Sequence, residues 1–313
     1  MKNKISAAFF TVVMAATMLA AVSVSGCGEV EPPSVVTPPY VPDAPAVTDP
    51  GDEEDSLHAA DGYDYYVHWV KSGDNYIYGR INVPEDFDED KAYPTVIMSH
   101  GFTATHEVYE PYVMTLTSLG YVCYTFDFAG GSYDSKSDGD FMDMTVFTEV
   151  DDLLAVADDV KRQDYFTVDE LYLMGESQGG LVTSIAAFDI DDVSGLVLLY
   201  PSYRKVEEIN EKYDSPEEVP EYNEFLGVEV GREYVTGLVG LDIYEELTKY
   251  ENEVVIYHGD KDGIVPLSAS IKADEAYPNC ELHIIENGYH GFRPSQAYEI
   301  SLDIDRWIRG LSD

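Results

Sequence analysis

Cysteine is scarce in this chain, whose 313 residues include only Cys27, Cys123 and Cys280. Three cysteines are too few for a disulfide framework. The sequence also lacks a CxxC spacing and a Cys/His cluster, the usual signs of a structural zinc site. We therefore expect that neither disulfides nor zinc organise the fold.

Basic residues are few as well, with 18 Lys and Arg against 60 Asp and Glu and a net charge of −42. A protein that binds a nucleic-acid backbone needs clustered Lys and Arg to displace counterions from the phosphates. The same charge disfavours electrostatic docking on anionic lipids. We therefore expect no nucleic-acid partner and no membrane contact through charge.

The first segment, residues 1–26, has the pattern of a targeting signal. Residues 1–4 include two lysines, and residues 5–24 are almost wholly apolar, which predicts a secretory signal peptide. Ser25 and Gly26 directly before Cys27 resemble the lipobox of bacterial lipoproteins, in which the cysteine is lipidated and becomes the first mature residue. The alternatives are a plain signal peptide and an uncleaved anchor, because about 20 apolar residues can span a bilayer.

Residues 27–55 read as a tether. From Gly28 to Asp55 there are seven prolines and eight acidic residues but no Lys or Arg. Such a composition cannot form a hydrophobic core, and charge repulsion keeps it extended. With a lipid on Cys27, it would hold a folded domain near the membrane. We predict an extracytoplasmic, membrane-anchored bacterial lipoprotein, at the cell surface or periplasmic face, that touches the membrane by its lipid anchor only.

Residues 56–313 have the pattern of one large α/β domain. With 45% hydrophobic and 12% aromatic residues, the chain has material for a large core. Residues 63–69 and 75–82 alternate polar and apolar side chains around Gly73-Asp74, which predicts an antiparallel hairpin. Short apolar runs then alternate with helical periodicity, the pattern of parallel strands joined by helices. The further predicted strands are 95–99, 122–126, 171–174, 195–200, 254–258 and 281–285.

The apolar periodicity predicts helices over residues 146–160 and 300–311, packed on the sheet. One stretch breaks the alternation: residues 203–250 carry 13 acidic residues, five basic residues and six tyrosines. A structureless loop of that length is uncommon inside a compact domain. We therefore expect an inserted cap after the sixth strand, with short elements of its own.

The strand 171–174 leads directly into Gly175-Glu176-Ser177-Gln178-Gly179, and a helical pattern follows. A strand, a G-x-S-x-G turn and a helix form the context of a nucleophile elbow. The glycines permit the sharp turn that exposes the Ser177 hydroxyl at the start of the helix. A bare G-x-S-x-G also occurs as an ordinary loop, but the flanking elements favour a catalytic serine.

A serine hydroxyl becomes a useful nucleophile only when a base accepts its proton and a carboxylate orients that base. Proteins with this elbow use the chain order serine, acid, histidine. His290, the last histidine of the chain, lies in a loop after the last predicted strand and is the candidate base. The acid should follow the strand 254–258, where spacing leaves both Asp260 and Asp262 open.

The negative oxygen that develops during acyl transfer needs two backbone N–H donors. The residue after the nucleophile, Gln178, should supply one of them. The loop after the strand 95–99 should supply the other, and Phe102 in Ser99-His100-Gly101-Phe102 is the best candidate. The role asked of Phe102 uses only its main chain, so its ring remains free to pack.

Five ordered motifs together resemble the α/β-hydrolase superfamily, and more narrowly the bacterial cinnamoyl/feruloyl esterases and related serine-aminopeptidase-like hydrolases. The resemblance covers residues 75–313, with the cap least similar. The motifs are His100-Gly101-Phe102, Phe126-Asp127-Phe128, Gly175 to Gly180, His258 to Pro266 and Gly288 to Phe292.

The resemblance implies an α/β-hydrolase fold with a mostly parallel central sheet and a catalytic triad of Ser177, Asp262 and His290. It implies oxyanion donors at Phe102 and Gln178. The acid falls on Asp262 through the family's HG-x-x-D-x-x-VP pattern. In related feruloyl esterases the cap binds the phenolic end of the acyl group. Tyr222 and Tyr234 are cap candidates for that contact, although tyrosines also pack caps.

This chain departs from the esterase pattern at two places. Ala129-Gly130-Gly131-Ser132 follows the F-D-F strand where those esterases often have N-G-H-G, and Glu176 stands where a histidine is frequent. Neither position belongs to the triad, but both line or support the site. In the superfamily's strand order Cys123 and Cys280 are distant, so we predict two free thiols.

The sequence therefore predicts a serine esterase that cleaves a small-molecule carboxylic ester through an acyl-enzyme, without a metal or an organic cofactor. A cinnamoyl or feruloyl ester is the substrate suggested by the resemblance. A peptidase or amidase with the same triad is the first alternative, because the elbow is common to both. A non-catalytic surface binding domain is the second.

Overall fold

The computed structural model describes residues 57–60 and 62–312. The predicted signal peptide, the lipidation site Cys27 and the tether lie outside the described residues. Within the described residues the central sheet has nine strands. They are β1 (Leu57–Ala60), β2 (Tyr63–Ser72), β3 (Asn75–Val83), β4 (Ala92–Ser99), β5 (Val122–Phe126), β6 (Thr167–Glu176), β7 (Val193–Leu199), β10 (Glu253–Gly259) and β11 (Cys280–Ile285).

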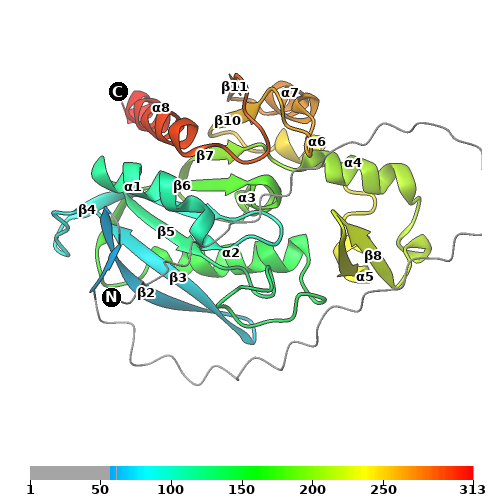
Figure 1. The fold of residues 1–313 in the computed structure, drawn as a ribbon, viewed down its shortest axis with the longest axis horizontal. Coiled ribbons are helices and arrows are strands. Elements are labelled where there is room, and N and C mark those ends of the chain that lie inside the picture. The colour runs from blue at the N-terminus through cyan, green and yellow to red at the C-terminus, as the bar shows by residue number, and fades with distance from the viewer. Residues whose placement is uncertain (1–56, 61, 313) are drawn as a thin grey trace, which may run out of the picture. The chain divides into compact units, whose positions relative to one another are not determined.

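The strands lie in the order β1-β2-β3-β5-β4-β6-β7-β10-β11. The pairs β1–β2, β2–β3 and β3–β5 are antiparallel. Every pair from β5 through β4 to β11 is parallel. Parallel strands need crossover connections, so helices lie between them in the chain (Figure 1). The helices are α1 (Glu110–Ser118), α2 (Val146–Val160), α3 (Ser177–Ala186), α7 (Leu267–Ala276) and α8 (Pro294–Ser312), with a short 3₁₀ turn, η1 (His106–Tyr109), before α1.

Apolar side chains of the parallel strands point alternately into two cores. On β4, Ile97 packs into a core with the apolar faces of α2, α3 and α7, whereas Val96 and Met98 pack into a second core with α1 and α8. On β6, Leu173 and Met174 divide in the same way. These strands are buried on both faces, which explains their continuous apolar sequences.

Residues 203–250, between β7 and β10, form short elements of their own, as expected for an inserted cap. Figure 1 shows α4, α5 and β8 beside the sheet. The strands β8 and β9 pair in a separate two-stranded antiparallel sheet. The elements are α4 (Tyr203–Lys212), η2 (Pro216–Glu218), β8 (Tyr222–Phe225), β9 (Val228–Gly231), α5 (Arg232–Thr236) and α6 (Ile243–Leu247).

The fold predicted from the sequence is confirmed, with small differences at element ends. Residues 122–126 and 146–160 form β5 and α2 with the predicted bounds, while β2 and β6 extend further than predicted. The short edge strand β1 was not predicted. Cys123 and Cys280 are free, as expected. No helix in the described part of the chain has the length and hydropathy of a membrane span.

Candidate active site

The predicted site residues follow the carboxyl ends of parallel strands. Phe102 comes after β4, Ser177 after β6, Asp262 after β10 and His290 after β11. Because these strands are parallel, their carboxyl ends lie along the same side of the sheet, which is where ligands bind in open α/β sheets. The topology therefore gathers residues that are up to 188 positions apart in the sequence.

Ser177 lies in a strained turn between β6 and α3. Its φ is 49°, in the left-handed region that residues other than glycine seldom occupy. The turn brings backbones so close that side chains would collide. A Cβ at Gly179 would lie 2.0 Å from the Ser99 carbonyl oxygen, and one at Gly175 would lie 2.4 Å from the Gly179 carbonyl oxygen. The glycines of the elbow are thus required by packing.

His290 connects Ser177 to Asp262. Its Nε2 lies 3.0 Å from Ser177 Oγ, and its Nδ1 lies 2.8 Å from Asp262 Oδ2. A carboxylate only accepts hydrogen bonds, so Nδ1 carries the proton and Nε2 of the neutral ring is free to accept the serine proton. The structure therefore brings together the three side chains predicted from the sequence, in an arrangement that can activate a serine hydroxyl.

The structure also separates the two candidate acids. The Asp262 side chain is fully buried, whereas Asp260 is partly exposed beside Lys261. Burial by itself raises the pKa of Asp262, but hydrogen bonds from His258 and His290 outweigh it and hold the pKa well below its usual range. The backbone N–H groups of Ile264 and Val265 donate to Asp262 Oδ1 at 2.8 and 2.9 Å. Asp262 is thus a fixed, ionised acceptor.

The loop after β4 lies against the nucleophile. A Cβ at Gly101 would lie 3.2 Å from Ser177 Cβ, so the main chain beside Phe102 directly faces the serine. The turn is closed by Ala104 N–H donating to the Gly101 carbonyl at 3.1 Å. Gln178 is the second residue of α3, and an N–H in the first helical turn has no carbonyl partner within the helix. Both predicted oxyanion donors therefore belong to backbone next to Ser177.

Glu176, one of the two departures from the esterase pattern, supports this loop. Its carboxylate accepts from Gly101 N–H at 3.3 Å and from the Tyr200 hydroxyl at 2.6 Å. The Tyr200 ring packs on the His290 ring with centroids 4.6 Å apart. Glu176 therefore links the loop after β4 to a ring that contacts His290.

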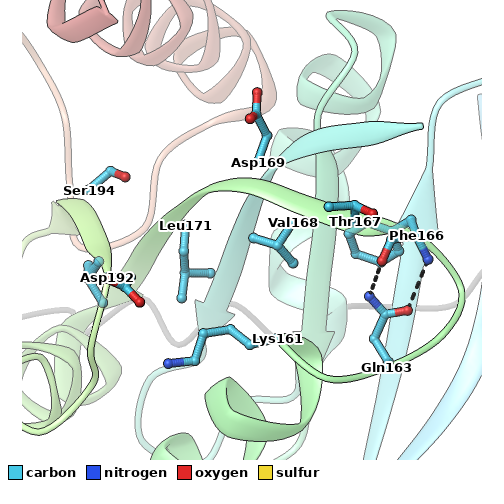
Figure 2. A pocket seen from close by; sticks show the side chains of 10 residues that line it. Lys161, Gln163, Phe166, Thr167, Val168, Asp169, Leu171, Asp192 and Ser194 are labelled. Carbon is cyan, nitrogen blue, oxygen red and sulfur yellow. Dashed lines mark hydrogen bonds between the residues drawn. The ribbon is translucent and has the colours of Figure 1, made fainter. Parts of the chain in front are cut away.

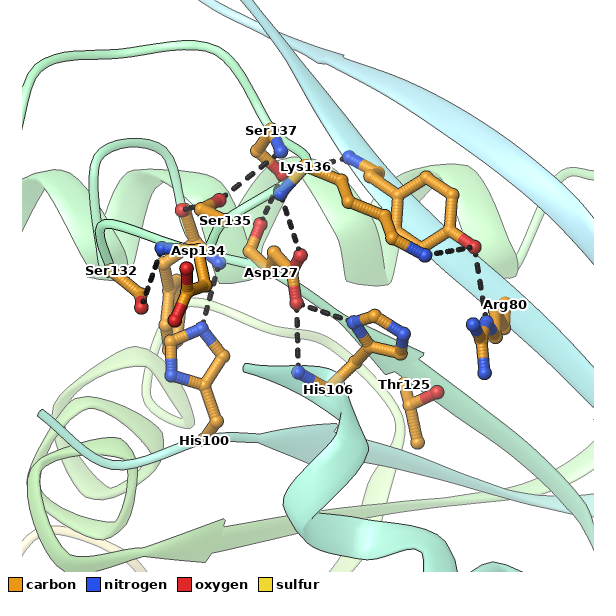
Figure 3. A network of polar contacts seen from close by, with 12 residues as sticks. Arg80, His100, His106, Thr125, Asp127, Ser132, Asp134, Ser135, Lys136 and Ser137 are labelled. Carbon is orange, nitrogen blue, oxygen red and sulfur yellow. Dashed lines mark hydrogen bonds and ion pairs between the residues drawn. The ribbon is translucent and has the colours of Figure 1, made fainter. Parts of the chain in front are cut away.

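A buried polar network holds the same loop from behind (Figure 3). The side-chain Nδ1 and the backbone N–H of His106 both donate to Asp127 Oδ1, at 2.6 and 2.7 Å. Lys136 N–H donates to Asp127 Oδ2 at 2.9 Å, and Ser132 Oγ donates to the Thr103 carbonyl at 3.1 Å. Burial raises the pKa of Asp127, but these bonds from His106 keep it below its usual value. Ser132 belongs to the second departure, which thus also braces the loop.

A second buried network, which was not predicted from the sequence, joins the cap to Gln178. The amide of Gln178 donates to Glu149 Oε2 at 2.8 Å and accepts from Lys205 Nζ at 2.6 Å. Tyr234 OH donates to the same Gln178 Oε1 at 2.6 Å. Lys205 is 4% exposed and Glu149 is 1% exposed. Glu149 lies three residues after Val146 and four before Leu153, on the buried face of α2, and this periodicity is the one signal that indicates its burial. No such pattern marks Lys205.

Tyr222 and Tyr234 are the two candidate cap tyrosines, and of these Tyr234 is the one whose hydroxyl contacts a site residue, Gln178. Its ring, with Phe141 and Phe225, surrounds the Phe102 ring at centroid distances of 5.2 to 5.7 Å. Tyr222 lies on β8 and is 61% exposed. The aromatic side of the site is therefore built by the loop after β4, the segment between β5 and α2, and the cap elements β8 and α5, with Tyr222 at the exposed end of β8.

A cleft of about 780 Å³ lies at the opposite, amino ends of the parallel strands. It is lined by residues at the start of β6 and β7 (Figure 2). Gln163 braces its wall by bonding both the N–H and the carbonyl of Phe166, at 3.1 and 2.8 Å. Leu171, the lining residue of β6 nearest to the nucleophile, is six residues from Ser177, so roughly 20 Å of strand separate this cleft from Ser177. The cleft is not part of the site around Ser177.

Comparison with known proteins gives matches to hydrolases. Residues 90–218 match the family described as serine aminopeptidase, S33. The chain is 28% identical over 124 residues to a probable dipeptidyl-aminopeptidase B from Neurospora crassa, but the match spans 34% of this chain and only 13% of that protein.

The structure is similar to that of Est1E from Butyrivibrio proteoclasticus with ferulic acid bound, at a TM-score of 0.67 and 27% identity. That similarity covers 75% of this chain and 98% of Est1E. The esterase EaEST from Exiguobacterium antarcticum, at a TM-score of 0.57 and 20% identity over 77% of this chain and 98% of that one, shows the same fold. The fold and these matches define a hydrolase. The chain belongs to the α/β-hydrolase superfamily.

Proposed function

We propose that this protein is a serine esterase that hydrolyses carboxylic esters through an acyl-enzyme. The observation that carries the proposal is the hydrogen-bonded chain from Ser177 Oγ through His290 to Asp262, at 3.0 and 2.8 Å, at the end of a strained elbow. The same arrangement of groups serves nucleophilic acyl transfer on several unrelated folds.

In the first step, Ser177 Oγ attacks the acyl carbon while His290 Nε2 takes its proton, and His290 returns that proton to the leaving alcohol. Asp262 keeps the imidazole oriented and stabilises its charged form. The N–H groups of Phe102 and Gln178 donate to the oxygen on which negative charge develops. Water then attacks the acyl-enzyme with His290 again as base, which releases the acid and restores Ser177. No metal or organic cofactor takes part.

Within this function, we propose an aromatic acyl group, of the cinnamoyl or feruloyl kind. Support comes from the similarity to Est1E, whose structure holds ferulic acid, and from the cluster of aromatic rings around Phe102. Aromatic rings favour offset and edge-to-face contacts with one another, so such a cluster suits a flat aromatic group.

The second candidate function is a serine peptidase or amidase. The match of residues 90–218 to the serine aminopeptidase family favours it, together with the partial match to a dipeptidyl-aminopeptidase. The triad alone does not separate the two, because both reactions pass through an acyl-enzyme.

A substrate panel tests the proposal. The full chain is compared with its Ser177→Ala variant on aryl acetate, butyrate and octanoate esters, methyl ferulate and an aminoacyl anilide. We expect ester turnover that depends on Ser177, with the highest kcat/KM for methyl ferulate. Preference for short aryl esters would support the esterase activity but contradict the proposed specificity for an aromatic acyl group. Preference for the anilide would favour the peptidase.

We also propose that the protein is a lipoprotein anchored through Cys27 outside the cytoplasm. The support is the sequence of the targeting segment and of the tether. The Cys27→Ala variant should lose the lipid mass and leave the detergent phase in a partition experiment. Absence of the lipid mass from the wild-type protein would contradict the anchor.

A further inference from the structure

We propose that Lys205 of the cap is a positioning residue for the oxyanion hole. This inference rests on the proposed function, because it assigns Lys205 a role in stabilising the transition state of that reaction. Lys205 touches no reacting atom. It acts through the two residues whose N–H groups would receive the negative oxygen, Phe102 and Gln178.

The Lys205 ammonium contacts both of those residues. It donates to Gln178 Oε1 at 2.6 Å, and it lies 5.3 Å from the centroid of the Phe102 ring. Its Nζ also contacts the Tyr234 hydroxyl. The rings of Phe225 and Tyr234 lie 4.0 and 4.5 Å from Nζ. A single buried cation thus fastens both sides of the predicted oxyanion hole to the cap.

Gln178 is fixed from both ends of its amide. Glu149 on α2 accepts from Nε2, while Lys205 and Tyr234 donate to Oε1. These bonds fix the orientation of the amide. Reversing it would place the Gln178 NH₂ group against the Lys205 ammonium and the Gln178 oxygen against the Glu149 carboxylate. The residue after the nucleophile is therefore held by α2 of the core and by α4 and α5 of the cap.

Lys205 and Glu149 are the two ionisable groups of this network, and burial decides the direction in which each pKa changes. Burial lowers the pKa of Lys205 and raises the pKa of Glu149, while the hydrogen bond from Gln178 to Glu149 and the opposite charge of each partner offset only part of these changes. Removing one partner would leave the other as an unpaired buried charge. A single substitution therefore disturbs both stability and geometry, and the experiment must separate the two effects.

Four variants of the full chain achieve this separation: K205M, E149Q, the double variant E149Q/K205M, and K212M. Lys212 lies on the same helix and is exposed, so K212M is the matched control. The measurements are kcat and KM with an aryl acetate, whose small acyl group asks little of the cap, and the melting temperature.

K205M should lower kcat about 10- to 100-fold with KM changed less than about threefold. This loss is smaller than the 10²- to 10³-fold cost of deleting an oxyanion donor, because the donors are displaced and not removed. K212M should match the wild type. The double variant should regain melting temperature lost in K205M, because it has no unpaired carboxylate, but its kcat should stay low.

A return of kcat together with melting temperature in the double variant would overturn the proposal, since Lys205 would then serve stability alone. So would a K205M kcat equal to that of K212M. If K205M does not fold, kcat of the double variant decides in the same way. Failure of the proposed function is a separate result, in which the wild type is no faster than Ser177→Ala.

Discussion

Two histidine–aspartate pairs, each joining a histidine Nδ1 to a fully buried aspartate, have nearly the same geometry and very different surroundings. His290 Nδ1 lies 2.8 Å from Asp262, and His106 Nδ1 lies 2.6 Å from Asp127. Both aspartates are fully buried, but the His290 side chain is 16% exposed and that of His106 only 2%. The Nε2 of His290 faces Ser177 Oγ, whereas the Nε2 of His106 has no hydrogen-bond partner among the described residues.

The difference shows that a His–Asp pair is not by itself a sign of catalysis. What distinguishes the pair at Ser177 is a nucleophile at the second ring nitrogen and access for a substrate. The pair of His106 and Asp127 instead ties η1, the turn that follows the loop carrying Phe102, to the end of β5. One pair is positioned to move a proton, and the other to hold backbone.

The largest effect should come from removing the nucleophile. Ser177→Ala should lower kcat on the order of a millionfold, as the loss of a triad serine does elsewhere, because His290 then has no hydroxyl to deprotonate. Steady-state assays on an aryl ester measure it, with S118A, an exposed serine on α1, as the control. A loss of only a few-fold would remove the distinction between the two pairs.

The next effect should come from the acid. Asp262→Asn should lower kcat about 10⁴-fold, because the amide no longer selects the tautomer with Nδ1 protonated. Asp260→Asn is the matched control, and its kcat should stay within about threefold of the wild type because Asp260 lies outside the chain of bonds to His290. Equal losses in the two variants would contradict the assignment of Asp262.

The same substitution in the other pair should act on stability and not on chemistry. Asp127→Asn replaces one of the two acceptor oxygens by an N–H donor, so the N–H groups of either His106 or Lys136 lose their acceptor, which should cost about 1 to 3 kcal/mol of unfolding free energy. The kcat of the folded fraction should fall less than about tenfold. Denaturant unfolding and active-site titration measure the two quantities. A collapse of kcat at unchanged stability would make this pair part of the chemistry.

The smallest effect is a pH dependence of that stability. Because the pKa of Asp127 is lower in the folded state than in the unfolded chain, its contribution is present above the ordinary value of about 4 and is lost as pH falls toward the folded pKa. The difference in unfolding free energy between the wild type and Asp127→Asn should therefore narrow between pH 5 and pH 3. A constant difference would show that the charge of Asp127 contributes nothing.

Much of the fold follows from the sequence because burial on both faces leaves long apolar strands and clear turns. The strand β5 and the helix α2 have the predicted bounds. The strand β1 escaped prediction because it is only four residues long and pairs on one side with β2. Such an edge strand needs little apolar periodicity.

The site could be predicted where local sequence dictates geometry. Ser177 needs glycines around its turn, and the order of the motifs selects His290. Spacing left Asp260 and Asp262 open, and the structure separates them by burial. The helical periodicity places Glu149 on the buried face of α2. Its connection to Lys205 through Gln178 could not be predicted, because it depends on how the cap packs against α2 and α3.

The acyl-enzyme on Ser177 is tested most directly by mass spectrometry of the intact protein during turnover of an aryl ester. We expect a transient adduct with the mass of the acyl group, mapped by peptide digestion to Ser177 and absent from Ser177→Ala. Turnover without such an adduct, or with the adduct on another residue, would rule out Ser177 as the nucleophile.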